Sequence, residues 1–364
     1  MEKIVDQIVP HVIGARFPGR YIQAPGLIAR LGVEARPLGT HGLCLLDNGL
    51  ADVLEGTLQE GAAGEIALTC RRHGGECSEA EIAAGVEAGR KARADLVIGA
   101  GGGKTLDTAK AVAHALSVPV VIVPTIAASD APCSALAVVY REDGSVAYDH
   151  FLPRNPDLVL VDTAIIARAP ARFLAAGIGD ALATFYEAES SRCAQAPNCW
   201  GTHGSPVTYA IARFCRDVIF EAGEAALAEC DRNEAGPALE RVVEANILLS
   251  GAGFESGGVA GAHAIHHGLC ELEDVHHHLH GEKVAIGVLA MLLIHGMEEE
   301  FAWVKAFCER VRLPVTLADV GIAEVTEAKL DRVAERACKA GDIMHNEPIA
   351  VSPQMVVAAL KRLA

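Results

Sequence analysis

Residues 1–165 alternate short runs of aliphatic and β-branched residues with stretches of helical periodicity, and this alternation constrains the fold more than any other feature. Parallel strands need long crossover connections, which are usually helices. A capping box at Ser78 predicts one such helix, ending near Ala94, and residues 105–116 predict another. Strands are expected at residues 42–47, 65–70, 95–100, 118–125 and 157–162. The sequence therefore predicts a parallel sheet covered by helices.

The strand pattern ends after Thr163, and the rest of the chain carries helical periodicities separated by glycine and proline. The clearest helices are expected at residues 206–230, 237–250, 282–295 and 328–340. No stretch of linker composition separates the two parts, so we expect a packed junction near residues 163–170. We predict an α/β domain over residues 1–164 and an all-helical domain over residues 165–364, with the ligand site in the cleft between them.

Composition and charge exclude several classes of protein. The 364 residues carry 31 basic and 47 acidic side chains, and the net charge of −16 repels nucleic acid and anionic lipid. The longest apolar stretch, residues 284–294, is shorter than the roughly 18 to 20 residues that cross a bilayer. The N-terminus does not resemble a secretion signal, and the 11 cysteines include no CxxC pair. We therefore expect a cytoplasmic protein with reduced thiols and with no nucleic-acid or membrane partner.

A glycine-rich turn at residues 98–105 (IGAGGGKT) follows the third predicted strand and precedes a predicted helix. Backbone N–H groups and the positive end of a helix bind phosphate at such turns. The segment is not a Walker A loop, because Ile98 stands where that motif has glycine. It is not a GxGxxG motif either, because Lys104 stands at the last glycine position. Three successive glycines before Lys-Thr favour a diphosphate, and a tight turn without a ligand is the alternative.

Asp47 closes the first predicted strand. A carboxylate there accepts hydrogen bonds from an adenosine ribose and repels a 2′-phosphate, which favours NAD over NADP. The alternative is an ordinary turn residue in the sequence Asp-Asn-Gly.

Seven of the 15 histidines lie between residues 263 and 280. Residues 261–268 are otherwise small and apolar, so buried imidazoles there need partners, and a divalent metal is the obvious one. His263 and His266 share a helix face, and His280 precedes the next apolar helix. Imidazole with a carboxylate is typical of catalytic zinc and ferrous sites, and Asp180, alone in the uncharged segment GIGDAL, is the candidate carboxylate.

Each of these features also has an interpretation without a metal. The run of histidines at 276–278 is also typical of a solvated polar loop. Asp180 is also compatible with a helix start, where the dipole favours a carboxylate. Cys270 has no second thiol nearby, so we expect a small buried residue there rather than a ligand.

At these residues the chain closely resembles the glycerol dehydrogenases of the iron-containing alcohol dehydrogenase family. The resemblance implies a Rossmann-like N-terminal domain, an all-helical C-terminal domain, as in the dehydroquinate synthase-like fold, and a cleft that holds NAD and a metal-bound polyol. The matching segments run nearly end to end: GGGKTLDTAKAVA, PTIAASDAPCSAL, LPRNPDLVLVDT, GIGDALATFYEA, LLSGAGFESGG, AHAIHHG, HGEKVAIG and MHNEPIAV.

The resemblance also implies roles for individual residues. Asp180, His263 and His280 would hold the metal, and Asp130 would hydrogen-bond the substrate hydroxyls. These four are the candidate catalytic residues. The segment from His263 to His280 is one residue shorter than the family pattern, which keeps His278 as an alternative to His280. The NAD site would comprise Gly102, Gly103 and Lys104 at the phosphates, Asp47 at the ribose, and Thr125, Ala128, Ser134, Leu136 and Tyr140 around the rest of the cofactor.

The implied reaction is the NAD-dependent oxidation of glycerol to dihydroxyacetone, or of related vicinal diols, by hydride transfer from an alkoxide stabilised by the metal. Zinc is the expected metal and ferrous iron the alternative. The resemblance also implies a homo-oligomer, such as an octamer. Three other functions are alternatives: a polyol-phosphate dehydrogenase, which needs a basic pocket; a dehydroquinate synthase-type lyase, which produces no net NADH; and a non-catalytic metal store, which leaves the glycine turn unexplained.

Overall fold

The computed structural model describes residues 12–141 and 144–364. Residues 1–11, part of the N-terminal segment in which we found no secretion signal, lie outside these ranges. The strands are β1 (Tyr21–Ala24), β2 (His41–Asp47), β3 (Ala67–His73), β4 (Leu96–Gly101), β5 (Val120–Pro124), β6 (Leu136–Tyr140), β7 (Val146–Phe151) and β8 (Leu158–Asp162). The helices of the first part are α1 (Leu31–Ala35), α2 (Ala51–Ala62), α3 (Glu79–Ala92) and α4 (Gly103–Leu116).

The helices that follow the last strand are α5 (Thr163–Ile166), α6 (Ala171–Ala194), α7 (Pro206–Asp231), α8 (Pro237–Glu244), α9 (Ser250–Gly257), α10 (Gly261–Leu269), α11 (His280–Ile294), α12 (Glu298–Arg310), α13 (Glu327–Ala337) and α14 (Pro353–Lys361). Among the helices of the described ranges, none has both the length and the apolar content needed to cross a membrane.

Six strands form a parallel sheet in the order β1-β8-β5-β4-β2-β3. Five of them correspond to the predicted strands, so the α/β prediction is confirmed. β3 differs from the strand predicted at residues 65–70, because it begins two residues later and continues through Arg71 and Arg72. Because β3 is an edge strand, these guanidinium groups reach acidic partners, Glu81 and Asp52.

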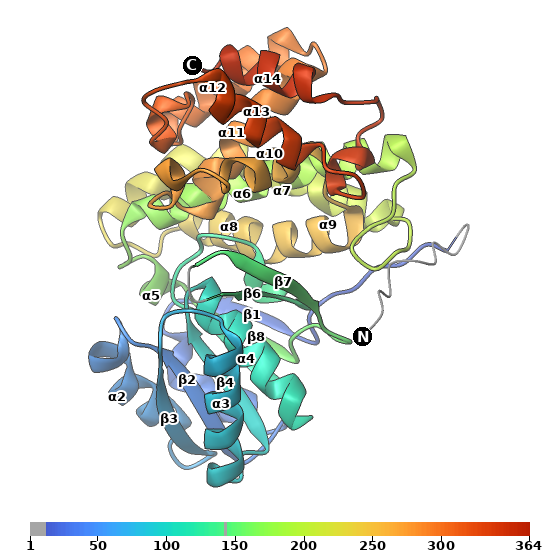
Figure 1. The fold of residues 1–364 in the computed structure, drawn as a ribbon. Coiled ribbons are helices and arrows are strands. Elements are labelled where there is room, and N and C mark those ends of the chain that lie inside the picture. Colours follow the sequence, from blue (N-terminus) through green and yellow to red (C-terminus); the bar gives the residue numbers. More distant parts are fainter. Residues whose placement is uncertain (1–11, 142–143) are drawn as a thin grey trace.

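Three strands were not predicted. β1 adds only four residues at the other edge of the sheet. β6 and β7 form a separate antiparallel hairpin, in which Leu136 pairs with Phe151. In Figure 1 this hairpin lies between the sheet and the helices drawn above it.

Beyond Asp162 the described residues contain helices and no further strand, as predicted, and Figure 1 shows these helices stacked together above the sheet. The helix predicted at 237–250 differs from the observed one. α8 ends at Glu244, a π-helical turn covers Ala245–Leu249, and α9 continues to Gly257. Such turns are rare and frequently lie at functional sites.

The junction between the two parts is packed. The largest group of buried apolar side chains combines Leu45 and Ile122 of the sheet with Ile178 and Leu289 of the helices. A second group, including Leu58 of α2, covers the other face of the sheet. The predicted packed junction is thus confirmed, while the division into domains at residue 164 stays a prediction.

Candidate active site

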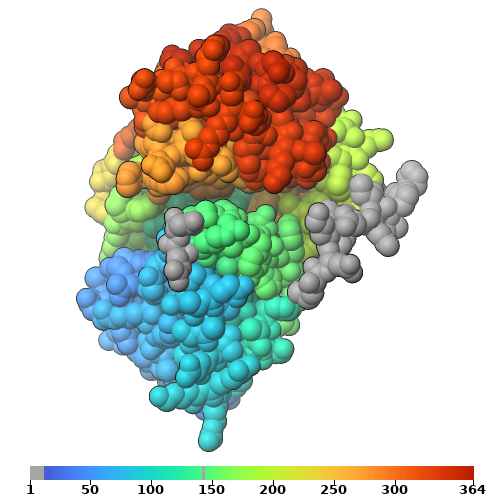
Figure 2. All heavy atoms as spheres, in the orientation of Figure 1, coloured from blue at the N-terminus to red at the C-terminus, as the bar shows by residue number. Residues whose placement is uncertain are grey.

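A cleft of about 680 Å³ opens between the sheet and the helices, and Figure 2 shows the surface recessed there. The glycine turn, the β6–β7 hairpin and α10 all contribute to its lining, together with Asp130 and His280. The predicted cofactor residues that line it are Asp47, Gly102, Gly103, Lys104, Ala128, Ser134, Leu136 and Tyr140. Thr125 does not; its hydroxyl is buried without a hydrogen-bond partner among the described residues.

The glycine turn lies between β4, which ends at Gly101, and α4, of which Gly102 is the N-cap. A Cβ at Gly103 would make ordinary van der Waals contacts, 3.8 Å from Ser129 Oγ and 4.0 Å from Ala131 Cβ. Glycine thus leaves that part of the cleft free beside the positive end of a 14-residue helix. Such a cradle fits a phosphate group.

Two charged side chains flank the turn. Asp47 is the last residue of β2, and its Oδ1 accepts a hydrogen bond from the backbone N–H of Gly49 at 2.9 Å. Lys104 pairs with Glu76, and its Nζ lies 5.2 Å from the centre of the Tyr140 ring. Asp47 therefore stands at the carboxyl edge of the sheet, where open α/β sheets bind their ligands.

A buried ion pair on α4 fixes the hairpin that closes this side of the cleft. Lys110 Nζ lies 2.8 Å from Asp107 Oδ1 and donates to the backbone carbonyls of Ser134 and Leu136. Asp107 Oδ2 accepts from the backbone N–H of Val138 at 3.0 Å. Ser134 and Leu136 are thus held against the cleft by contacts at their backbone.

The other end of the cleft brings together the three predicted metal ligands. One potential ligand atom from each of Asp180, His263 and His280 lies within 4.8 Å of the other two. Asp180 Oδ1 is 3.0 Å from His280 Nε2 and 3.4 Å from His263 Nε2. His278 does not join them, since its Nδ1 faces Glu282 Oε2 at 3.4 Å. Of the two alternatives left by the sequence, the structure brings His280 to Asp180.

Asp180 lies in the middle of α6, so the helix-start interpretation is wrong. The helix begins nine residues earlier, at Ala171. Its glycines serve close packing instead: a Cβ at Gly177 would lie 1.9 Å from Ala127 O, and one at Gly179 would lie 2.4 Å from Gly281 O. These approaches bring α6 against the loop that leads to Asp130 and against the start of α11.

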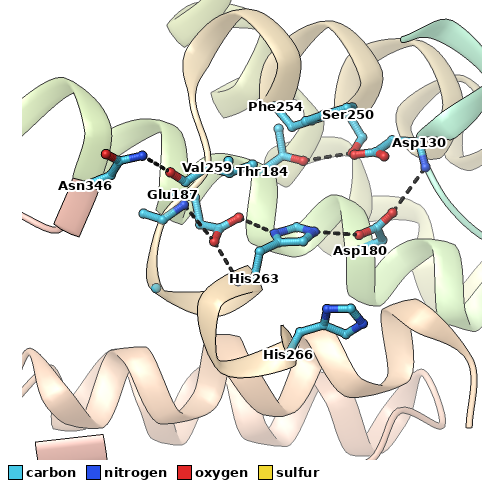
Figure 3. Close-up of polar contacts among 12 residues, drawn as sticks. Asp130, Asp180, Thr184, Glu187, Ser250, Phe254, Val259, His263, His266 and Asn346 are labelled. Atoms are coloured by element: carbon cyan, nitrogen blue, oxygen red, sulfur yellow. Dashed lines mark hydrogen bonds and ion pairs between the residues drawn. The ribbon is translucent and has the colours of Figure 1, made fainter. Parts of the chain in front are cut away.

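Glu187 lies behind His263 and sets its orientation. This fully buried carboxylate accepts from His263 Nδ1 at 2.6 Å and, through its other oxygen, from the backbone N–H groups of Ala260 and His263. Figure 3 shows the His263 ring between Glu187 and Asp180. Because Nδ1 donates to Glu187, the Nε2 nitrogen is the one directed at Asp180, the arrangement usual for a metal-binding histidine.

The electrostatics of this end call for a positive charge. Burial by itself lowers the pKa of His263, but Glu187 and Asp180 outweigh it and raise the pKa well above its ordinary value. Burial raises the pKa of Asp180, but His280 and His263 hold it well below its ordinary range. A divalent cation between one carboxylate and two imidazoles would satisfy the same electrostatics, so the donor set fits a zinc or ferrous ion.

Asp130 lies against this group. Its backbone N–H donates to Asp180 Oδ2 at 3.2 Å, and its Oδ2 accepts from Ser250 Oγ at 2.9 Å. Ser250 also contacts Thr184 Oγ1 at 2.8 Å, and these contacts form a short chain in Figure 3. Burial, followed by the negative charge of Asp180, raises the pKa of Asp130. The π-helical turn that precedes Ser250 directs this residue and Asn246 at the loop carrying Asp130.

Glu187 and Ser250 were missed by the sequence analysis. Glu187 follows Asp180 by seven residues, two helical turns along one face of a helix that is otherwise largely uncharged there. That spacing could have indicated that Glu187 lies on the same side of the helix as Asp180. No sequence pattern could have indicated Ser250, because the direction of its side chain depends on the π-helical turn.

A family model, related sequences and solved structures all indicate the same family for this chain. The sequence model of the iron-containing alcohol dehydrogenase family matches residues 18–163. The chain is 50% identical to a glycerol dehydrogenase of Thermotoga maritima over 349 residues, 95% of each chain. It is 40% identical to a glycolaldehyde reductase of Halobacterium salinarum over 350 residues, again 95% of each.

Among solved structures, a probable glycerol dehydrogenase from Sinorhizobium meliloti 1021 superposes with a TM-score of 0.92 at 42% identity, covering 97% of this chain and 98% of the other. The similarity thus extends over both the sheet and the helices. The chain belongs to the iron-containing alcohol dehydrogenase family.

Proposed function

We propose that this protein is an NAD-dependent, metal-dependent glycerol dehydrogenase, which oxidises glycerol to dihydroxyacetone. The observation that carries the proposal is the convergence of Asp180, His263 and His280 at one end of a cleft whose other end is the glycine turn. The glycerol dehydrogenase of Thermotoga maritima, identical at half of the aligned positions, supports the choice of substrate.

The residues of the metal end would divide the work between them. Asp180, His263 and His280 would hold a divalent metal, which when bound lowers the pKa of an alcohol and stabilises the negative charge that develops on its oxygen. Glu187 keeps His263 Nε2 directed at the site. Asp130, which lines the cleft next to these residues, would hydrogen-bond the substrate hydroxyls and so fix which carbon faces the cofactor.

The glycine turn would bind the cofactor at the other end. Gly102, Gly103 and Lys104 would hold the diphosphate of NAD, and Asp47 would accept from the adenosine ribose. Ala128, Ser134, Leu136 and Tyr140 would complete the walls. A cofactor held by these residues would supply the hydride acceptor, and the shared cleft would keep it close to the substrate bound beside Asp130.

The proton released from the alcohol has a candidate acceptor in His267. Its imidazole lines the cleft, and its Nδ1 lies 3.7 Å from Asp342 Oδ1. We propose that His267 passes this proton to bulk water, either directly or through a bound water molecule.

The composition of the cleft argues against a phosphorylated polyol as substrate. Lys104 is the one lysine or arginine among the described residues that line it, and Lys104 belongs to the glycine turn. The substrate end carries Asp130 instead, and among the described residues no lysine or arginine side chain there would balance the charge of a phosphate group.

An assay of NADH absorbance over a panel of diols tests the proposal, together with glycolaldehyde in the reducing direction because of the Halobacterium salinarum relative. We expect glycerol-dependent NADH formation that chelation abolishes and that zinc or ferrous ions restore. No net NADH formation with any diol would refute it and favour a lyase. Assembly into a homo-oligomer is part of the proposal and can be measured by light scattering.

A further inference from the structure

The two imidazoles of the proposed metal centre are held in different ways. His263 donates from Nδ1 to the Glu187 carboxylate at 2.6 Å. His280 Nδ1 lies 3.1 Å from Nε2 of another histidine, His266, and the two rings meet edge to face with their centres 4.4 Å apart. The side chain of His280 is also the more exposed of the two, at 41% against 14% for His263.

A histidine that binds a metal through Nε2 has no proton on that nitrogen, so its proton is on Nδ1 and needs an acceptor. For His280 this acceptor is Nε2 of His266, which is uncharged when it accepts. We propose that His266 is a positioning residue that orients His280 for metal binding; the inference rests on the metal site of the proposed function.

His266 is well placed for this role. It lies on α10 three residues after His263, so one helical turn supplies a ligand and also the partner of the other ligand. The residue is buried, with 8% of its surface exposed, so its surroundings restrict the ring. A neutral ring that accepts at Nε2 carries its proton on Nδ1, which has no hydrogen-bond partner among the described residues, so Nδ1 makes no bond that competes with this orientation.

Cys270 is the one competitor for this nitrogen that the structure shows, with its Sγ 3.4 Å from His266 Nε2. A thiol is a weak donor, so it displaces an imidazole N–H poorly. Because His266 Nε2 also faces the thiol, its hydrogen bond with His280 Nδ1 is weaker than it would be without Cys270. His280 is therefore the less firmly held ligand, because His263 has a carboxylate partner and a charge-assisted bond.

Zinc affinity of the metal-free protein, measured by competition with a chromophoric chelator, tests the inference without any turnover. His266→Leu keeps most of the volume but cannot accept a hydrogen bond, whereas His266→Gln places an amide oxygen close to the position of Nε2. We expect zinc binding about 10- to 100-fold weaker in His266→Leu, the range found when such partners are removed, and largely restored in His266→Gln. The exposed His277, changed to alanine, is the matched control and should bind zinc as the wild type does.

Wild-type zinc affinity in His266→Leu would overturn the inference, and so would an equal loss in His277→Ala. A His266→Gln variant that melts like the wild type without metal, yet binds zinc as poorly as His266→Leu, would overturn it as well. If His266→Leu does not fold, His266→Ala takes its place. Asp180→Asn in the same titration separates the two proposals: wild-type zinc affinity there would refute the metal centre itself, whereas loss there with retention in His266→Leu would refute only the role of His266.

Discussion

The two ends of the cleft differ in the groups that form them, which are mainly backbone groups at one end and side chains at the other. At the glycine turn, backbone groups of one short segment between β4 and α4 do most of the work, and the flanking Asp47 and Lys104 are partly exposed. At the metal end, side chains from α6, α10 and α11 meet around a fully buried carboxylate. One end depends on the local conformation of the chain, and the other depends on how three helices pack.

This difference separates binding from chemistry. Most side chains near the glycine turn can be replaced without moving the backbone N–H groups. Substitutions there should therefore alter which cofactor is preferred rather than abolish cofactor binding. At the other end, Asp180, His263 and His280 are the proposed ligands, so a single change there should remove the reaction while the cofactor end stays intact.

The largest effect is expected for Asp180→Asn. The amide keeps the size and can still accept from the backbone N–H of Asp130, but it removes the charge that holds both imidazoles. Losing several kcal/mol of charge stabilisation lowers kcat by about 10³-fold or more. Steady-state kinetics with glycerol and metal analysis of the purified protein measure this. NAD binding, followed by calorimetry, should stay within a few-fold of wild type; loss of NAD binding in parallel would show that the two ends are not independent.

A smaller loss is expected for Glu187→Gln. The amide oxygen can still accept from the backbone N–H groups of Ala260 and His263, but the amide nitrogen then faces His263 Nδ1. The imidazole must move its proton to Nε2, the nitrogen that should bind the metal. We expect zinc affinity to fall about 10- to 100-fold. Glu189→Gln, on the same helix but paired with Arg192 at the surface, is the control and should not change zinc binding.

The same difference explains what the sequence could predict. The glycine turn and Asp47 are local features, next to one strand end and one helix start, and they were found from residue patterns alone. Asp180, His263 and His280 were candidates from the residues as well, but joining them into one ligand set needed the family resemblance, because no local rule connects residues so far apart in the chain. The roles of Glu187 and His266 depend on contacts between α6, α10 and the start of α11, which no periodicity encodes.

The errors have the same origin. Asp180 is compatible with a helix start because glycines precede it, but those glycines allow α6 to approach Ala127 and Gly281 closely. The β6–β7 hairpin was missed although β6 reads LAVVY, a run rich in strand-forming residues. Its position depends on Lys110 of α4, which donates to the backbone carbonyls of Ser134 and Leu136.

Glu255 of α9 joins the two parts and should make their junction sensitive to pH. It accepts from the backbone N–H of Ala135 and from Asn155 Nδ2, and burial raises its pKa from 4.5 to about 7. An acid whose pKa is higher in the folded state stabilises the fold when protonated. That contribution is complete below pH 4.5 and is lost as the pH rises through 7.

Each pKa unit corresponds to about 1.4 kcal/mol, so the wild-type melting temperature should fall by several degrees relative to Glu255→Gln between pH 5 and pH 8. Parallel melting curves across that range would contradict the assignment. Zinc affinity at a fixed pH should be the same in both proteins, because the Glu255 carboxylate bonds to Ala135 and Asn155 rather than to the proposed ligands.

The smallest effect, and the one that tests the cofactor end alone, is expected for Asp47→Gly. Removing the carboxylate abolishes repulsion of a 2′-phosphate and also a hydrogen-bond acceptor for the ribose. A change of about 1 to 2 kcal/mol in the relative binding of the two cofactors at this partly exposed position raises the NADP to NAD ratio of kcat/KM about tenfold.

Asp52→Ala on α2, whose exposed carboxylate pairs with Arg72, is the matched control and should leave the ratio unchanged. Zinc content should be that of the wild type in both variants. An unchanged cofactor preference in Asp47→Gly would mean that the backbone of the glycine turn, rather than this side chain, sets the choice of cofactor.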